Sequence, residues 1–295
     1  TLRDLGDSLV VVGGERLWNV HVHVDDVGAA IEAGITAGRP YRIAVTHFAD
    51  ERRGTVRAGA EDGIADGSED GADRPATRAV VATAAGPGLA ALYREAGADV
   101  LEFRVGDDLS VSRMLDTIAA TSAREVIVLP NSTDYVAVCE AAASRAREDD
   151  VRVSVVPTHT QVQGLSALAV HQPGRAFDDD VIAMTSAAGH THHGAVTVAE
   201  EAGITMAGPC RPGDVLGVVE GEFAVVGHDQ TEVALEVLSR LMSGSAELVT
   251  IVAGEGVDPG TVGRLEESVR ASRPDVDSVV YDGGQQRYRL LLAAE

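Results

Sequence analysis

Two histidines lie one residue apart in the segment NVHVHVDDVG, where His21 and His23 alternate with valines. On a β-strand, side chains two residues apart point to the same face, with Cα atoms about 6.5–7 Å apart. The two imidazoles are therefore placed to bind one metal ion. The same alternation also fits a strand whose valines face a core and whose histidines face water. Two ligands do not make a zinc site, so both interpretations stay open.

Two aspartates, Asp25 and Asp26, extend the pair to HVHVDD. This run is comparable with the HxHxDH signature of hydrolases with the metallo-β-lactamase fold. A metal-dependent hydrolase built on His21, His23 and one aspartate is therefore an alternative. Asp26 stands where that signature has its last histidine, and the sheet that precedes the motif in that fold needs far more chain upstream.

Three other features carry reactive or ligand-binding residue types. The run AAGPGLAAL places Gly86 and Gly88 between a strand and a helix, where a phosphate can bind. Pro87 removes one N–H donor, which favours a simple tight turn. The histidine-rich run GHTHHG at residues 189–194 has no acidic ligand nearby and is predicted as a surface loop. Cys139 falls in a helical pattern and is predicted to be a small core residue.

The elements that must position these residues begin with a small α/β module over residues 1–49. Two β-rich runs, SLVVVG and RLWNVHVHV, are joined by a glycine pair that indicates a hairpin. A helix is expected over VGAAIEAGITAG, with an aspartate cap ahead of it, and a strand over YRIAVTHF. Residues 50–78 are rich in Gly, Asp, Glu and Ala and are predicted to be a flexible acidic linker.

Strands and helices alternate from residue 79 onward. The apolar runs AVVATAA, DVLEF, EVIVLP and VRVSVVP are separated by helix-length segments, which predicts βαβ units and a parallel sheet. After Pro157 we expect a helix near residues 177–188, the strand pair DVLGVVEG/EFAVVGHD, and then helix, strand, helix and two strands. The predicted fold class is α/β: a small domain at 1–49, and a domain at 79–295 whose parallel-sheet subdomain precedes an α+β subdomain.

Two predicted loops follow strands of the parallel sheet, where ligands and partners gather in open α/β folds. The runs LPNST and VPTHTQVQG contain the candidate contact residues Asn131, Thr158, Gln163 and Gly164. Helix capping and turn formation explain the same residues equally well.

Composition excludes several classes of function. The net charge of −22 argues against nucleic acid or an anionic membrane as a partner. The 24 basic residues are all arginines, so the chain holds no Schiff-base lysine and no Walker-type phosphate lysine. Two cysteines are too few for a disulfide scaffold, and no apolar run reaches membrane-spanning length. We therefore predict a cytoplasmic location without membrane insertion, and the start at Thr1 suggests a piece of a longer protein.

Several segments, in order, resemble a bacterial protein family, fatty acid kinase A, which has a DhaL-type kinase domain at its N-terminus. GDSLVVVGGERLWNVHVHVDDVGAAIEAGITAG is similar to its middle domain. Its C-terminal domain is DegV-like. The segments similar to that domain are VATAAGPGLAALYREAGADVLEF, VIVLPNSTDYVAVCEAA, VVPTHTQVQGLSALAVHQP, AMTSAAGHTHHGAVTVAEE and GDVLGVVEGEFAVVG. The resemblance covers nearly the whole chain outside the linker.

The resemblance implies a structural zinc ion held by His21, His23 and a cysteine upstream of Thr1, so the zinc site of this chain would be incomplete. It places the carboxylates that bind ATP and magnesium in the absent kinase domain, so no catalytic residue is assigned here. It also implies a non-catalytic docking and dimerisation portion that forms a homodimer. Its partner would be a fatty-acid-binding protein of the DegV family, whose acyl chain is phosphorylated for phospholipid synthesis. A stand-alone lipid-binding module is a further alternative, because DegV-like domains can hold acyl chains.

Overall fold

The computed structural model describes residues 6–14, 17–24, 27–37, 78–104, 106–244 and 246–295. The chain divides into two compact units, Thr1–Asp70 and Gly71–Glu295. The strand predicted over YRIAVTHF and residues 50–77 of the predicted linker lie outside the described residues.

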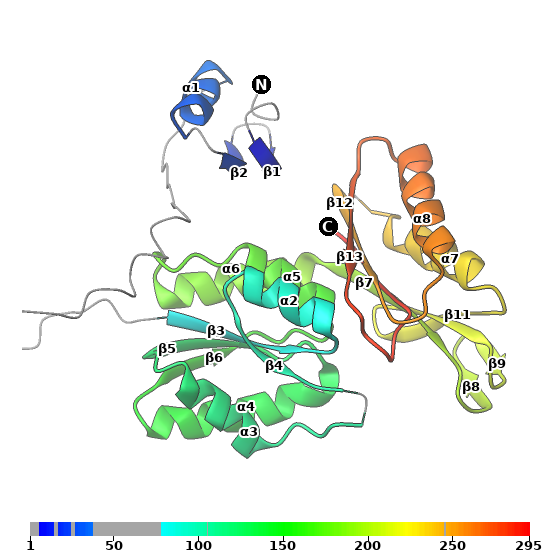
Figure 1. Cartoon of the computed structure of the whole chain (residues 1–295), viewed down its shortest axis with the longest axis horizontal. Helices are drawn as coiled ribbons and strands as arrows, with labels where there is room; N and C mark the ends of the chain where they lie inside the picture. The colour runs from blue at the N-terminus through cyan, green and yellow to red at the C-terminus, as the bar shows by residue number, and fades with distance from the viewer. Residues whose placement is uncertain (1–5, 15–16, 25–26, 38–77, 105, 245) are drawn as a thin grey trace, which may run out of the picture. The chain divides into compact units, whose positions relative to one another are not determined.

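The described residues of the first unit form a strand pair and one helix (Figure 1). Strands β1 (Gly6–Gly14) and β2 (Leu17–Val24) are antiparallel, and Gly13 pairs with Trp18. Helix α1 (Val27–Ala37) follows. The predicted hairpin and helix are therefore present in this unit.

A four-stranded parallel sheet forms the first layer of the second unit, in the order β4-β3-β5-β6. Its strands are β3 (Arg78–Ala84), β4 (Asp99–Glu102), β5 (Glu125–Leu129) and β6 (Arg152–Val155). Helices cover both faces, which is why the strands are apolar on both sides. Val80 belongs to one core cluster and Val81 to another, as the alternation of side chains across a strand requires.

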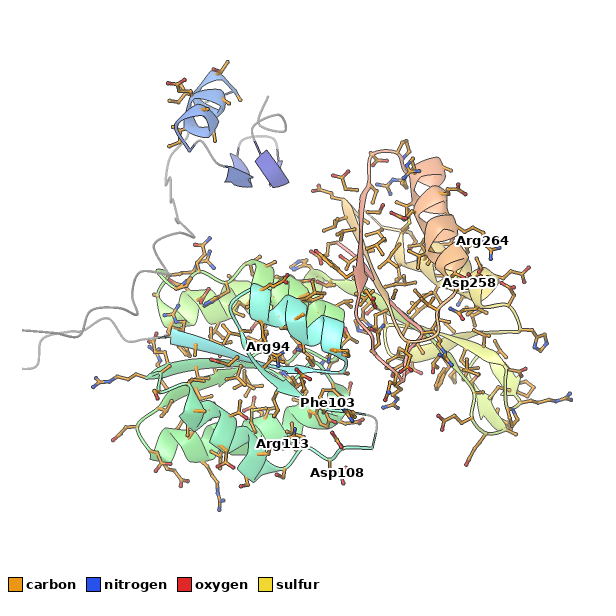
Figure 2. All side chains as sticks on the ribbon, in the orientation of Figure 1. Arg94, Phe103, Asp108, Arg113, Asp258 and Arg264 are labelled. Atoms are coloured by element: carbon orange, nitrogen blue, oxygen red, sulfur yellow. The ribbon has the colours of Figure 1, made fainter. Side chains whose placement is uncertain are left out.

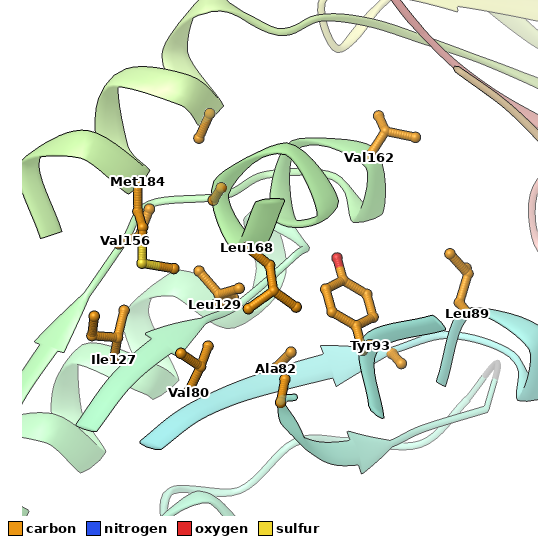
Figure 3. Close-up of a cluster of buried hydrophobic side chains, with 14 of the residues drawn as sticks. Val80, Ala82, Leu89, Tyr93, Ile127, Leu129, Val156, Val162, Leu168 and Met184 are labelled. Carbon is orange, nitrogen blue, oxygen red and sulfur yellow. The ribbon is translucent and has the colours of Figure 1, made fainter. Parts of the chain in front are cut away.

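The helices of this layer divide between the two faces of the sheet (Figure 1). On one face lie α2 (Pro87–Glu95), α5 (Gln161–Ala169) and α6 (Phe177–His190). On the other lie α3 (Val111–Ala120) and α4 (Thr133–Glu148). Figure 3 shows the core under α2 and α5, where the fully buried Tyr93, Leu129 and Met184 meet above β3 and β5.

A six-stranded mixed sheet forms the second layer, in the order β11-β10-β7-β14-β12-β13. Its strands are β7 (His192–Val198), β10 (Val215–Val219), β11 (Glu222–Gly227), β12 (Leu248–Ala253), β13 (Asp277–Asp282) and β14 (Leu290–Ala294). β12 and β13 are parallel, and the other neighbours are antiparallel. A small hairpin, β8 (Gly203–Thr205) and β9 (Gly208–Cys210), extends from this layer.

Two helices, α7 (Gln230–Leu241) and α8 (Pro259–Ser272), pack on the six-stranded sheet. The sequence specifies where they begin, because Asp229 accepts hydrogen bonds from the backbone of Thr231 and Glu232. Asp258, labelled in Figure 2, caps α8 through the backbone N–H of Gly260 at 2.9 Å. The mixed α/β architecture confirms the predicted fold class. No helix among the described residues is long and apolar enough to cross a membrane.

Candidate functional site

A wide cleft of about 2220 Å³ lies between the two layers of the second unit. Its first wall is formed by the segments that follow β3, β4, β5 and β6, at residues 85–87, 103–104, 106–108, 131–135 and 159–161. Its second wall comes from the six-stranded sheet and the β13–β14 connection. We call this space the interlayer cleft. Because it lies at the carboxyl ends of parallel strands, it occupies the usual ligand-binding position of an open α/β sheet.

Asn131 organises the first wall. It has a φ of 53°, a left-handed conformation that asparagine tolerates better than most residues. Its backbone N–H donates to the Thr158 hydroxyl at 2.9 Å, and that hydroxyl donates to Asn131 Oδ1 at 2.8 Å. Its Nδ2 donates to the Thr83 carbonyl at 2.8 Å. Asn131 and Thr158 are 3% and 0% exposed, so these bonds tie the ends of β3, β5 and β6 together inside the protein.

Gly164 packs against this network. A Cβ at this position would collide with Asn131 Oδ1 and the Tyr93 hydroxyl oxygen, so only glycine fits. The Tyr93 hydroxyl donates to the Gln161 carbonyl at 2.6 Å, and burial raises the pKa of Tyr93 well above its usual value. The predicted contact residues Asn131, Thr158 and Gly164 therefore lie together.

Gln163, the fourth predicted contact residue, is directed elsewhere. Its Oε1 accepts from the backbone N–H of His159 at 2.9 Å, and its Nε2 donates to the Ala188 carbonyl at 3.2 Å. It therefore joins the loop before α5 to the end of α6. Of the four predicted residues, Asn131 lines the interlayer cleft, and the others lie behind it. A contact between any of them and a partner stays a prediction.

The glycine-rich turn before α2 joins the two layers. The backbone N–H groups of Gly88 and Leu89 both donate to the Gly283 carbonyl at 3.1 Å. A Cβ on Gly88 would collide with the Asp282 carbonyl, so this glycine permits the close approach. The position that a phosphate would take at a helix N-terminus is filled by a backbone carbonyl, in agreement with the interpretation as a tight turn.

The histidine-rich run at 189–194 is not a surface loop, contrary to our prediction. It connects α6 directly to β7, and His193 is buried. His193 Nε2 lies 3.5 Å from Glu220 Oε2, while His192 Nδ1 lies 2.9 Å from Glu220 Oε1. Burial lowers the pKa of His193, and Glu220 partly offsets that effect, whereas His159 and His192 add to it.

The prediction of a zinc ion is wrong for the described residues. Among them, no group of three or more His, Cys, Asp or Glu side chains could hold a metal ion. His21 and His23 lie on β2, opposite Val10 and Asp7 of β1. Structural zinc sites take four ligands, and no such set includes the two histidines within the described part of the chain. The hydrolase alternative depends on the same pair and gains no support.

Two family models match the chain. The model for the C-terminal domain of FakA-like fatty acid kinases matches residues 79–295, and the model for their middle domain matches residues 1–55. Protein YloV of Bacillus subtilis is 26% identical over 295 residues, and the match covers 100% of this chain and 52% of that protein. The chain spans about half the length of the curated relatives that it matches.

Solved structures show the same fold at low sequence identity. A DegV family protein from Corynebacterium glutamicum is similar with a TM-score of 0.55 and 14% identity, covering 74% of this chain and 95% of that chain. A DegV lipid-binding protein from Thermotoga maritima is similar with a TM-score of 0.53 and 12% identity, covering 74% and 98%. These likenesses show the fold alone, whereas the C-terminal family model covers most of the chain by itself. The chain therefore belongs to the FakA-like family of fatty acid kinase proteins.

Proposed function

We propose that this chain is the non-catalytic docking portion of a fatty acid kinase A-like protein. It binds a fatty-acid-binding partner of the DegV family, and a kinase domain elsewhere in the whole protein transfers the phosphate. The observation that carries this proposal is the match to both the middle and the C-terminal family models, in chain order. The family is described as one of the subunits of a kinase, which implies a second, different one.

The interlayer cleft supports a docking role by its size. Pockets for small molecules have volumes of about 300–1,000 Å³. The cleft measures about 2220 Å³, so it suits a segment of protein better than a small ligand. Its first wall is held by the buried hydrogen bonds of Asn131 and Thr158, which give a partner a rigid surface.

A stand-alone lipid-binding module is the second candidate, because one similar structure is a DegV lipid-binding protein. An acyl chain needs an apolar channel, and the apolar interior between α2, α5 and β3 is filled by the protein's own side chains. Figure 3 shows Leu89, Tyr93 and Leu168 in that space, and each is at most 5% exposed. The packing favours docking over lipid storage.

Phosphate transfer by another part of the protein agrees with the chemistry of this chain. Phosphoryl transfer requires a nucleotide-binding cradle and cations that stabilise the moving phosphate. The glycine-rich turn before α2 instead binds the Gly283 carbonyl, and the sequence holds no lysine. These features support the assignment of catalysis to the half of the relatives' length that this chain does not cover.

The test combines the full chain with lipid-loaded partner, ATP and magnesium. We expect a complex by gel filtration and calorimetry, without acyl phosphate. The same chain extended upstream to include the kinase domain should form acyl phosphate under identical conditions, which makes it the matched positive control. ATP consumption by the chain alone would contradict the assignment of catalysis, and absence of a complex would contradict docking.

A further inference from the structure

Carboxylate side chains dominate the rim of the interlayer cleft. Among the described residues that line it, eight are acidic and two are arginines. Two of the eight have basic neighbours: Asp134 lies 3.9 Å from Arg287, and Glu220 contacts the imidazoles of His192 and His193. The other six form no salt bridge with any residue that the structure describes: Asp107, Asp108, Glu200, Glu201, Glu255 and Asp282. The cleft therefore carries an uncompensated negative charge.

The electrostatic effect of these groups is visible at Tyr135, which stands in the first wall. Burial raises the pKa of the Tyr135 hydroxyl, and the nearby Asp134, Asp107 and Asp108 raise it further. Its ring packs edge-to-face on Phe103, with ring centroids 4.8 Å apart. Figure 2 shows Phe103 and Asp108 on the segment after β4. An apolar aromatic pair thus lies beside clustered carboxylates, which strengthens their field.

Two buried glutamines add unsatisfied acceptors to opposite walls of the cleft. Gln161, at the start of α5, is 5% exposed, and Gln285, in the β13–β14 connection, is 2% exposed. Their Nε2 groups donate to the carbonyls of Asn131 and Val252 at 3.2 and 3.1 Å. These donations fix which end of each amide is nitrogen. Each Oε1 is then left without a hydrogen-bond partner.

A buried acceptor without a hydrogen-bond partner lowers the stability of the folded protein until a donor reaches it. Carboxylates and amide oxygens accept hydrogen bonds, whereas guanidinium and ammonium groups only donate. The occupant that satisfies both the charges and the two orphaned oxygens is therefore rich in cationic donors. A free fatty acid, a nucleotide or a nucleic acid is anionic and would be repelled by the same groups.

We propose that the interlayer cleft receives a basic, arginine- or lysine-bearing surface segment of the partner protein. The inference rests on the proposed docking function, and it specifies the chemistry of the partner surface that enters the cleft. The charges on the rim steer the partner toward the cleft, and a shift of the wall glutamines on docking lets their buried oxygens accept its side-chain donors. This chemistry also makes the complex sensitive to salt.

The experiment neutralises four exposed carboxylates of the cleft in one variant: Glu200→Gln, Glu201→Gln, Glu255→Gln and Asp282→Asn. A matched control carries the same change of charge on exposed residues away from the cleft: Glu95→Gln, Asp116→Asn, Glu140→Gln and Glu267→Gln. Calorimetry of each full chain with the lipid-loaded partner gives the affinity at low and at moderate salt. All eight substituted residues are exposed, and circular dichroism confirms that each variant is folded.

We expect the cleft variant to bind the partner at least about tenfold more weakly than wild type and to lose most of the salt dependence. The control should stay within about twofold of wild type. A hexa-arginine peptide should compete with the partner on wild type, and a hexa-glutamate peptide should not. Equal weakening in both variants, or no competition by hexa-arginine, would overturn the inference.

Failure of the inference is distinguishable from failure of docking. If the partner binds both variants like wild type, docking stands and the cleft is not its site. If the partner binds none of the proteins, docking fails, and a direct hexa-arginine titration decides the chemistry of the cleft. If hexa-arginine binds wild type and the control but not the cleft variant, a basic occupant from another protein is supported. Equal binding of hexa-arginine by wild type, the cleft variant and the control would overturn the inference of a basic occupant.

Discussion

Asn131 and Thr158 exchange two hydrogen bonds across the ends of β5 and β6, backbone N–H to hydroxyl at 2.9 Å and hydroxyl to Oδ1 at 2.8 Å. Both residues are buried, so neither bond has water as a substitute. The shape of the first wall of the interlayer cleft therefore depends on one threonine hydroxyl.

The first prediction concerns that hydroxyl. Thr158→Val keeps the shape but leaves the Asn131 N–H and Oδ1 without partners, so the free energy of unfolding should fall by about 1–3 kcal/mol. Urea unfolding followed by circular dichroism measures the loss. Thr158→Ser, which keeps the hydroxyl, should lose clearly less. Equal losses in the two variants would show that the methyl group, rather than the hydrogen bonds, stabilises this site.

The second prediction concerns the helix that packs behind Asn131. Gly164→Ala places a methyl group against Asn131 Oδ1 and the Tyr93 hydroxyl, so it should lower the unfolding free energy by about 1–3 kcal/mol or more. Gly263→Ala in α8 is the matched control, because open space surrounds that position. That substitution should raise the unfolding free energy by about 0.5–1 kcal/mol through helix propensity. If both variants became more stable, the close contact at Gly164 would be refuted.

The third prediction concerns pH. Burial holds the folded-state pKa of His193 below its ordinary value of 6.5, so the unfolded chain takes up this proton at a higher pH than the folded chain. The stability contributed by neutral His193 is fully present above pH 6.5 and is lost as the pH falls toward the lowered folded-state pKa. The slope from this one proton is at most about 1.4 kcal/mol per pH unit.

His193→Gln tests this dependence, because glutamine does not titrate. Unfolding free energies between about pH 7.5 and 5.5 should fall less steeply in this variant than in wild type. His190→Gln, at an exposed position, should keep the wild-type slope. Glu295, whose carboxyl pKa is raised by partial desolvation, affects all three proteins alike. Parallel curves for wild type and His193→Gln would rule out His193 as the source.

The fourth prediction concerns the two cysteines, which are both buried and free. Burial, with a smaller effect of Glu140, raises the pKa of the Cys139 thiol to about 12, so the reactive thiolate is scarce at neutral pH. A colorimetric thiol reagent should therefore detect no fast-reacting Cys139 in the native protein, and both cysteines should react in denaturant. Cys139→Ser identifies which thiol reacts. Fast native labelling that disappears in that variant would contradict the buried placement.

Most helices and strands of the second unit were predictable because their apolar residues repeat with a clear period. Helix α5 was missed for the opposite reason. Residues Gln161–Leu168 are buried on nearly every side except at Leu165, so the helix has no polar face to reveal a period of 3.6 residues. We predicted VPTHTQVQG to be a loop, whereas α5 begins within this segment, at Gln161.

Strand β7 was missed because histidines at its start usually indicate an exposed segment. His193 instead is the second residue of a central strand and lies beside Glu220, a residue distant in sequence. The acidic cleft was hidden for a related reason. Its carboxylates come from loops, the first turn of α4 and the end of β13, between Asp107 and Asp282, and only the folded chain brings them to one surface. The sequence reveals the total charge but not where that charge gathers.

The position of β14 has a consequence for biosynthesis. It pairs with β7 on one side and β12 on the other, although it is the last of the described strands to leave the ribosome. Until residues 290–294 emerge, β7 and β12 each present an open, hydrophobic edge with no neighbour between them. The nascent six-stranded layer is therefore most prone to chaperone binding and aggregation just before β14 is synthesised. A ribosomal pause at that stage would lengthen the time for which these edges are exposed.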